Sequence, residues 1–280
     1  MLAEIIAAIR PLDEAAMEKC RTRLDNLTKP LGSLGSFEEL ALKMAGITGQ
    51  PRLREIHPRL VVIGGNRRTP GVLDVFARHV GAKIVAVDAT EVADVNAALL
   101  TDGLNRGLLV GMEAAKARVV GIGMAGELPP AAVAAVSTWF RDSDEEWMGV
   151  LEQAGGLELA EMTGIILGAA AGGAVVVLDG LATGLAALIA VRLAPPAKEY
   201  LMASHFAAEP AHAEVLRLLD LPAYLYLGLN FGEGVGAALG ISLLQASLHM
   251  LNDMKTFGEA QVHVAEDGPG SLVQNPAVRD

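Results

Sequence analysis

A glutamate between two glycines is the position in this chain that best suits chemistry. Glu233 stands in LNFGEGVGAALG, with Gly232 and Gly234 beside it and Gly236 close behind. Glycines let a ligand approach the backbone closely, and a carboxylate at such a place can act as a general base. The same residues also suit an ordinary turn with a solvated helix-cap glutamate. GEGVG is neither GxGxxG nor a P-loop, because the spacing differs and no Lys-Ser/Thr pair follows.

The elements that must position Glu233 alternate between short β-branched runs and longer Ala/Leu-rich segments. Strands are predicted at 59–65, 83–89, 118–123, 174–180, 199–204 and 223–229. Helices are predicted at 2–9, 14–24, 36–47, 70–80, 93–116, 130–140, 156–171, 181–193, 210–220 and 235–254. Most of the strands are apolar on both faces, as strands covered by helices are. This pattern predicts an α/β fold, a doubly wound and mostly parallel six-stranded sheet with right-handed crossovers.

Small and polar residues follow the predicted strands. In open parallel sheets, ligands bind beyond the carboxyl ends of the strands, so these residues are candidates for substrate binding. Besides Gly232, Gly234 and Gly236, they are Gly121, Gly123, Asp179, Gly180, Ser204 and His205. We expect them to surround one cleft together with Glu233. The helix that begins near Val235 would point its positive end toward that cleft.

Three of these stretches have competing interpretations. Asp179 either meets a ligand or caps the next helix, and the two roles are compatible. SHFAAEPAH (204–212) contains Ser, His and Glu, but it lacks the GxSxG elbow and metal-ligand spacing, so a loop that closes one wall of the pocket is favoured. Arg67 and Arg68 follow the first strand and either meet a phosphate or lie in a solvated loop.

Composition excludes several classes of protein. The chain has 280 residues, 52% apolar and 4% aromatic, with 31 glycines and a formal net charge of −11. That charge disfavours nucleic acid as a partner, although local glycine loops can still bind a small phosphorylated ligand. A single cysteine, Cys20, indicates a reducing compartment, which we take to be the cytoplasm. The apolar run 163–178 is interrupted by glycines and ends at Asp179, which indicates a buried helix, turn and strand, and no membrane is expected.

Several stretches together resemble one enzyme family. They are LDNLTKPLGSLGSFEELALKMAGITG, GGLELAEMTGIILGAAAGGAVVVLDG and SHFAAEPAH, followed by LNFGEGVGAALG. In this order they resemble the nicotinate mononucleotide:5,6-dimethylbenzimidazole phosphoribosyltransferases of cobalamin synthesis. The resemblance covers roughly half of the chain, and the motifs are far more specific together than singly.

The resemblance implies a fold, a reaction and an assembly. It implies a small helical domain formed by residues 1–51 and 255–280, a sheet domain over 52–254, and a homodimer. It also implies that Glu233 takes a proton from a benzimidazole nitrogen while the other ring nitrogen attacks C1 of the ribose. Nicotinate then leaves, and α-ribazole phosphate forms with inverted configuration. The expected partners are therefore a small nucleotide and an aromatic base, and neither a cofactor nor a metal is implied.

The chain also departs from the family pattern. GGNRRTPG (64–71) replaces an Asp-His-Gly stretch, GIGMAGELPP (121–130) replaces GEMGIGNTT, and the GRGTG segment has no counterpart. Ala207, Asn230 and Phe231 replace a serine, an arginine and a leucine. We hypothesise that Arg67 and Arg68 supply a substitute phosphate anchor. The alternative function is a catalytically impaired paralogue that binds a base, nucleotide or corrinoid precursor as a sensor or partner subunit.

Overall fold

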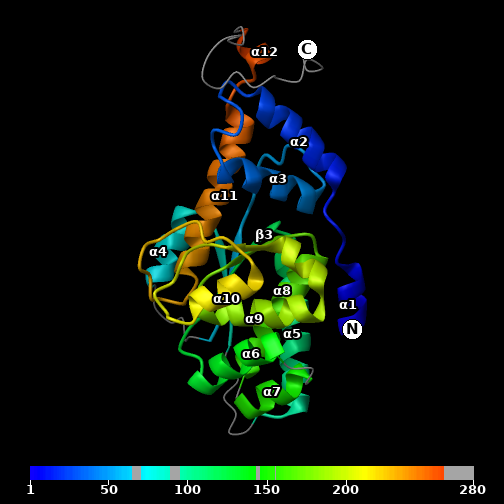
Figure 1. Ribbon diagram of the computed structural model, residues 1–280, viewed down its shortest axis with the longest axis vertical. Helices are drawn as coiled ribbons and strands as arrows, with labels where there is room; N and C mark the ends of the chain where they lie inside the picture. The colour runs from blue at the N-terminus through cyan, green and yellow to red at the C-terminus, as the bar shows by residue number, and fades with distance from the viewer. Residues whose placement is uncertain (65–70, 89–94, 143–145, 155, 262–280) are drawn as a thin grey trace. The chain divides into compact units, whose positions relative to one another are not determined.

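The computed structural model describes residues 1–64, 71–88, 95–142, 146–154 and 156–261 (Figure 1). Two compact units divide the chain. The first unit combines Met1–Pro11 with His57–Ile241, and the second combines Leu12–Ile56 with the chain from Ser242 onward. The domain boundaries expected after residue 51 and before residue 255 stay a prediction.

A parallel sheet forms the core of the first unit. Its strands are β1 (Arg59–Ile63), β2 (Lys83–Val87), β3 (Val119–Met124), β4 (Val175–Leu178) and β5 (Leu201–Ala203). The order is β2-β1-β3-β4-β5, and every neighbouring pair is parallel. The three inner strands are buried almost throughout, which is why they read as continuous apolar runs rather than as alternating ones. The parallel α/β fold predicted from the sequence is therefore confirmed.

The number of strands was predicted wrongly. The described residues form a sheet of five strands, not six, because 223–229 contributes only one parallel bridge, between Leu225 and His205. Tyr226 is 74% exposed and Leu227 55% exposed, so this segment does not have the helix cover that keeps the inner strands buried. Gly228 adopts φ +63°, which interrupts an extended backbone. An apolar run resembles a strand even where tertiary structure leaves it at the surface.

Helices lie on both faces of the sheet (Figure 1). Those of the first unit are α1 (Leu2–Ala8), α4 (Val72–His79), α5 (Ala97–Ala115), α6 (Pro130–Asp142), α7 (Trp147–Ala154), α8 (Leu157–Ala171), α9 (Leu181–Leu193) and α10 (His212–Leu219), with a short 3₁₀ helix at Pro195–Tyr200. The sequence analysis did not predict α7. The apolar run 163–178 is a buried helix, a turn and a buried strand, as predicted.

One long helix, α11 (Val235–Asp253), begins in the first unit and ends in the second. Its first turns pack directly on the sheet, because Gly121 lies beneath Ala237 and Ile241 and Gly240 lies against Val177. By length and composition this helix could cross a membrane. However, 56% of its most apolar window is buried within the structure, and core helices of soluble proteins meet the same criterion.

The second unit is helical where it is described. Besides the end of α11 it contains α2 (Glu14–Asn26), α3 (Ser36–Thr48) and α12 (Phe257–Ala260). Its core includes Cys20, Leu24, Leu27 and Leu251. Arg23 stabilises the contact between the two ends of the chain, because its Nε donates to the carbonyl oxygen of Leu251 at 2.8 Å.

Candidate functional site

The Gly232–Glu233–Gly234 turn leads directly into α11. Gly232 is exposed, the Glu233 side chain is half-buried, and Gly234 is buried with φ +97°, a conformation that favours glycine. Glu233 therefore stands two residues before Val235, the buried first residue of α11, where the backbone N–H groups attract negative charge.

The end of β3 holds the first half of this turn. The N–H of Met124 donates to the carbonyl oxygen of Gly232 at 2.9 Å. A Cβ on Gly123 would lie 2.4 Å from the nitrogen of Gly234 and 2.6 Å from the carbonyl carbon of Glu233. Only glycine at position 123 lets the peptide after Glu233 rest on the strand end, so the predicted link between these two stretches is real contact.

Asp179, which follows β4, holds the second half. Its Oδ2 accepts from the N–H of Gly234 at 2.7 Å and its Oδ1 accepts from the N–H of Ala237 at 3.2 Å. Burial raises the pKa of this carboxyl to about 7, while the backbone donors of Gly234, Ala237 and Gly236 lower it and the charge of Glu209 raises it. Asp179 is thus the N-terminal cap of α11.

Ser204 and His205, which follow β5, pack against the first turns of α11, Ser204 against Gly240 and His205 against Gly236. The Ser204 hydroxyl donates to the carbonyl oxygen of Leu178 at 2.8 Å and lies 2.9 Å from Nδ1 of His205, so its oxygen can accept from the ring N–H. A Cβ on Gly236 would lie 2.1 Å from the His205 ring and 2.5 Å from Oδ1 of Asp179. Both side chains are buried, and burial lowers the pKa of His205.

Two interpretations of Asp179 were open, contact with a ligand or a cap on the next helix. The structure shows a cap, but on α11 rather than on α9, the helix that follows Asp179 in sequence. The N-terminus of α9 begins at Gly180 and receives Oε2 of Glu209, which lies 3.4 Å from the N–H of Leu181. Burial raises the pKa of Glu209. A Cβ on Gly180 would lie 3.0 Å from that same oxygen.

The predicted residues therefore fall into two groups. Gly123, Asp179, His205 and Gly236 contact the turn that carries Glu233 or one another. Gly121 lies apart from that group, because its neighbours are the side chains of Leu60, Ala237 and Ile241 between sheet and helix.

Sequence reasoning missed the roles of Glu209 and His212. The N–H of Ala207 donates to Nδ1 of His212 at 3.0 Å, and burial, with a smaller effect of His205, lowers the pKa of His212 to about 4. SHFAAEPAH was interpreted as a wall of the pocket, which stays a prediction; the segment holds two buried imidazoles and the half-buried carboxylate of Glu209. The sequence signal that could have indicated these roles was the presence of two histidines and a glutamate within the nine residues of SHFAAEPAH.

Two further expectations concern metal and phosphate. Among the described residues, no group of three or more His, Cys, Asp or Glu side chains is placed to hold a metal ion. Arg67 and Arg68, the hypothesised phosphate anchor, lie outside the described residues.

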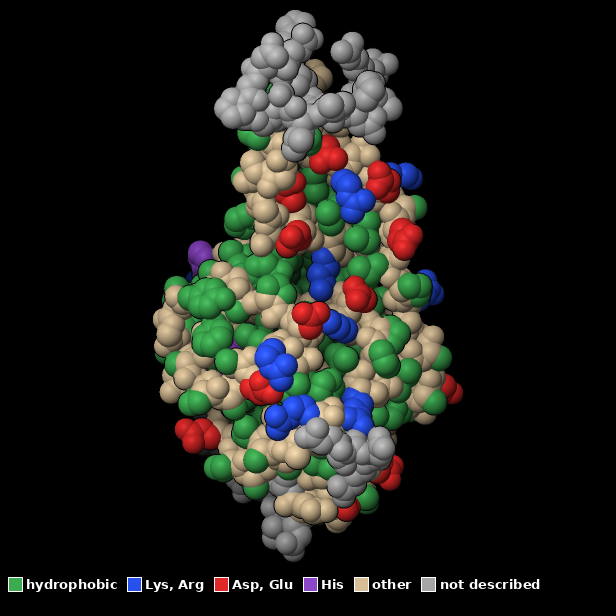
Figure 2. All heavy atoms as spheres, in the orientation of Figure 1, with side chains coloured by type: hydrophobic (Ala, Val, Ile, Leu, Met, Phe, Trp, Pro, Cys, Tyr) green, Lys and Arg blue, Asp and Glu red, His purple; other side chains and the backbone are tan. Residues whose placement is uncertain are grey.

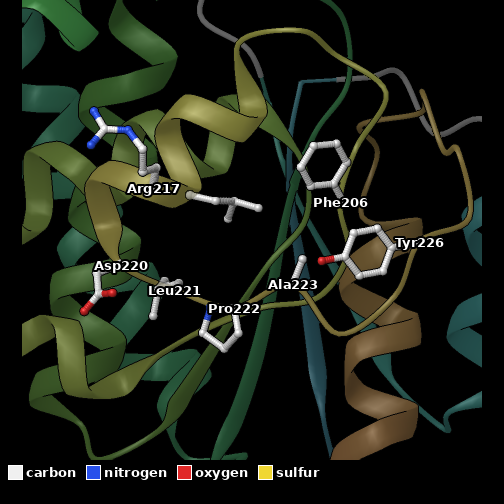
Figure 3. A pocket seen from close by; sticks show the side chains of 8 residues that line it. Phe206, Arg217, Asp220, Leu221, Pro222, Ala223 and Tyr226 are labelled. Carbon is white, nitrogen blue, oxygen red and sulfur yellow. The ribbon is translucent and has the colours of Figure 1, made fainter.

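A hollow of about 460 Å³ lies beside α10 (Figure 3). Its lining includes Phe206, Tyr226, Leu216 and Pro222, and the two aromatic rings stack at 5.6 Å. In Figure 3 the guanidinium of Arg217 points away from the hollow. Glu233 is not among the lining residues, so this hollow is separate from the turn described above.

Comparisons with known proteins identify the family of this chain. The family model for a phosphoribosyltransferase matches residues 9–69 and 107–262, which defines the class of enzyme. The nicotinate-nucleotide–dimethylbenzimidazole phosphoribosyltransferase of Chloroflexus aggregans is 32% identical over 345 residues, covering 94% of this chain and 98% of its own. The enzyme of the same name from Desulforudis audaxviator is 31% identical over 350 residues, covering 95% and 99%. This chain belongs to the nicotinate-nucleotide–dimethylbenzimidazole phosphoribosyltransferase family, which is a family of pentosyltransferases.

A solved structure supports the same assignment. The crystal structure of the nicotinate-nucleotide–dimethylbenzimidazole phosphoribosyltransferase from Thermus thermophilus matches with a TM-score of 0.77 and 26% identity, covering 91% of this chain and 100% of that one. The alignments to the relatives exceed 340 positions whereas this chain has 280 residues, so the relatives carry segments that this chain lacks. The family model also leaves residues 70–106 unmatched.

Proposed function

We propose that this protein transfers the phosphoribosyl group of nicotinate mononucleotide to a benzimidazole-type base, with Glu233 as the general base. Membership of the family supports the reaction, and the relatives named for it cover nearly the whole chain. The observation that carries the role of Glu233 is the doubly held turn, with Met124 on one side and Asp179 on the other. Nothing in the comparisons favours the alternative of a catalytically impaired paralogue.

The chemistry follows from a carboxylate at this place. Glu233 takes the proton from one ring nitrogen of the base, and the other nitrogen forms a bond to C1 of the ribose. The bond from C1 to the nicotinate nitrogen breaks, nicotinate leaves with the bonding electron pair, and the anomeric configuration inverts. Such a displacement depends on position more than on a protein nucleophile, because holding the two substrates in line removes most of the entropic cost of bringing them together.

The other predicted residues take supporting or contacting roles in this proposal. Gly232 and Gly234 shape the floor next to Glu233, while Gly123 and Gly236 admit the close contacts beneath it. Asp179, Gly180, Ser204 and His205, which are all buried, support the ribose side from within the fold. Gly121 supports the site indirectly, by letting α11 lie close to β3.

Nicotinate release tests the proposal directly. The purified protein is incubated with nicotinate mononucleotide and 5,6-dimethylbenzimidazole, and free nicotinate is separated and measured. We expect turnover in the wild type and a loss of about 10²-fold or more in Glu233→Gln, since general-base catalysis contributes roughly 10²–10⁴-fold. Glu199→Gln, an exposed carboxylate on the 3₁₀ helix, is the matched control. Equal rates in Glu233→Gln and wild type would remove Glu233 from the mechanism.

We also propose that the protein works as a homodimer in the cytoplasm. The resemblance to the family supports the dimer, and the single buried cysteine agrees with a reducing compartment. Light scattering after size exclusion is expected to give twice the chain mass of 29.1 kDa. A mass equal to that of one chain at micromolar concentration would contradict it.

A further inference from the structure

The buried carboxylate of Asp179 holds the turn that carries Glu233. Its side chain is 1% exposed, and both oxygens accept from backbone N–H groups that begin α11. A carboxylate away from water is costly unless it is fully hydrogen-bonded, and here the donors come from a single turn and the helix behind it. The position of that turn and the charge of Asp179 therefore depend on one another.

The turn is held at both of its ends. Its first residue, Gly232, binds β3 through the N–H of Met124, and its last residue, Gly234, binds Asp179. Glu233 lies between these two attachments with its side chain half-buried. The attachment to β3 restrains the start of the turn, so the direction of the Glu233 side chain depends on the attachment to Asp179.

We propose that Asp179 is a positioning residue, whose carboxylate fixes the turn and thereby holds Glu233 in place above the end of β3. The proposal rests on the proposed function, because it assigns Glu233 the role of base. The carboxylate of Asp179 accepts from backbone N–H groups, and in this proposal it does not touch the substrates, so it is not itself a catalytic residue.

The protonation state of Asp179 governs how firmly the turn is held. A carboxylate offers acceptors on both oxygens, whereas a protonated carboxyl turns one oxygen into a donor that faces the N–H of Gly234 or Ala237. Two titratable side chains face this carboxyl: His205 borders the same Gly236, and the negative charge of Glu209 opposes ionisation. The turn itself contributes Glu233. Asp179 has a pKa of about 7 in the folded protein, and the N–H donors of the turn lower that pKa. As long as Asp179 stays buried, loss of its proton as the pH rises through neutrality therefore strengthens the attachment of the turn, although global unfolding, which exposes Asp179 to water, has the opposite pH dependence.

Replacement by asparagine tests the idea with little change in volume. The asparagine side chain keeps one acceptor but presents an amide N–H₂ to a backbone N–H, and it cannot ionise. We expect Asp179→Asn to lower kcat for nicotinate release by about 10²-fold while KM changes less than about threefold, because misplacement of a catalytic group acts mainly on the reacting geometry. We also expect the wild-type rise of kcat between pH 6 and 8 to disappear in the variant.

Amide hydrogen exchange of residues 232–238 gives a readout that needs no turnover. In Asp179→Asn these amides are expected to exchange at least about tenfold faster than in wild type, after correction for the intrinsic pH effect. In the wild type their protection against local opening, in which Asp179 stays buried, should increase from pH 5.5 to 8.5. Asp13→Asn is the matched control, because it alters the N–H acceptor that caps α2 (2.9 Å to Ala16) in the other unit.

The outcomes separate the two proposals. Wild-type kcat and an unchanged pH profile in a folded Asp179→Asn protein, or unchanged exchange at 232–238, would overturn the positioning role. An absence of nicotinate release in the wild type with faster exchange in the variant would overturn the proposed function and leave the attachment intact. If Asp179→Asn does not fold, the positioning role is tested instead by Asp179→Glu and by the pH dependence of amide exchange in the wild type. Asp179→Glu should keep the rise of kcat with pH, and flat wild-type protection would again overturn the positioning role.

Discussion

Two regions of this protein depend on glycine for opposite reasons. In the helix pair α5–α8, a Cβ on Gly107 would lie 2.0 Å from the carbonyl oxygen of Glu161, and a Cβ on Gly164 would lie 2.2 Å from that of Leu104. Backbone meets backbone there, and each missing side chain lets two buried helices touch. This contact stabilises the fold and leaves no room for a ligand.

At the turn before α11 the glycines admit polar side chains instead. Gly236 lies against the His205 ring and the carboxylate of Asp179, and Gly123 lies against the peptide after Glu233. Here the missing side chain brings titratable groups to a backbone that carries a functional residue. A glycine therefore contributes to function only through the groups that approach it, and the sequence shows the glycine but not its neighbour.

The largest expected effect lies in the helix pair. Gly107→Ala should lower the free energy of unfolding by about 3 kcal/mol or more, since the added Cβ meets backbone that cannot move without separating α5 from α8. Urea denaturation measures this. Gly103→Ala on the same helix is the control, because its Cβ would meet the flexible end of Leu157 at 2.9 Å, and we expect a change below about 1 kcal/mol. Equal losses in both variants would contradict the distinction.

A substitution at the turn before α11 should lower both the stability of the protein and the rate of nicotinate release. Gly236→Ala places a Cβ 2.1 Å from His205, so either the ring or the turn must shift. We expect a loss of about 2 kcal/mol in unfolding free energy and at least a tenfold lower rate of nicotinate release in the protein that remains folded.

A neighbouring glycine sharpens this prediction. In Gly232→Ala the nearest atom would be the carbonyl oxygen of Met124 at 3.5 Å, an ordinary contact, so unfolding free energy should change by less than about 0.5 kcal/mol. If Gly236→Ala proves as stable as Gly232→Ala, the tight packing described around His205 is wrong.

Two buried titratable groups, His212 and Asp179, should change the free energy of unfolding with pH in opposite directions. Burial lowers the pKa of His212 from 6.5 to about 4. Between pH 4 and pH 6.5 the histidine is therefore protonated in the unfolded chain and neutral in the folded chain. Stability from this group therefore falls as the pH drops from 6.5 to 4, by up to roughly 3 kcal/mol at 1.36 kcal/mol per pKa unit.

Asp179 acts in the other direction. Its pKa rises from 3.8 to about 7 on folding, so the folded chain binds the extra proton and stability from this group falls as the pH rises through that window. His212→Asn should reduce the acid-side loss of stability, and Asp179→Asn should reduce the loss toward neutral pH. Thermal melting from pH 4.5 to 8 measures both. His57→Asn, at an exposed histidine, is the matched control.

The smallest effect is expected at the hollow beside α10. Hydrophobic side chains gather there on the face drawn in Figure 2, left of centre. Tyr226 is 74% exposed and gains mainly from stacking on Phe206, so Tyr226→Ser should cost less than about 1 kcal/mol and leave nicotinate release unchanged. A tenfold fall in the rate would show that the hollow belongs to the functional site.

Local patterns were sufficient for most of the architecture. The buried runs that became β1, β3 and β4 are apolar on both faces, and the intervening helices carry the spacing that predicts them. The predictions of secondary structure failed where the burial of a segment depends on other parts of the chain that pack against it. The run 223–229 has the composition of a strand and only one bridge, and α7 was missed between two stretches of ambiguous polarity.

The sequence by itself determined the parallel α/β fold, the family and the glutamate between two glycines, because each is written in residues close together along the chain. Tertiary structure alone decided what holds that glutamate. Asp179 passes over the adjacent helix α9 and binds a turn 55 residues away, while Glu209 takes the place at α9. A hydrogen bond requires two groups to meet in space with the right geometry, and for residues so far apart only the packing of strands and helices brings them together.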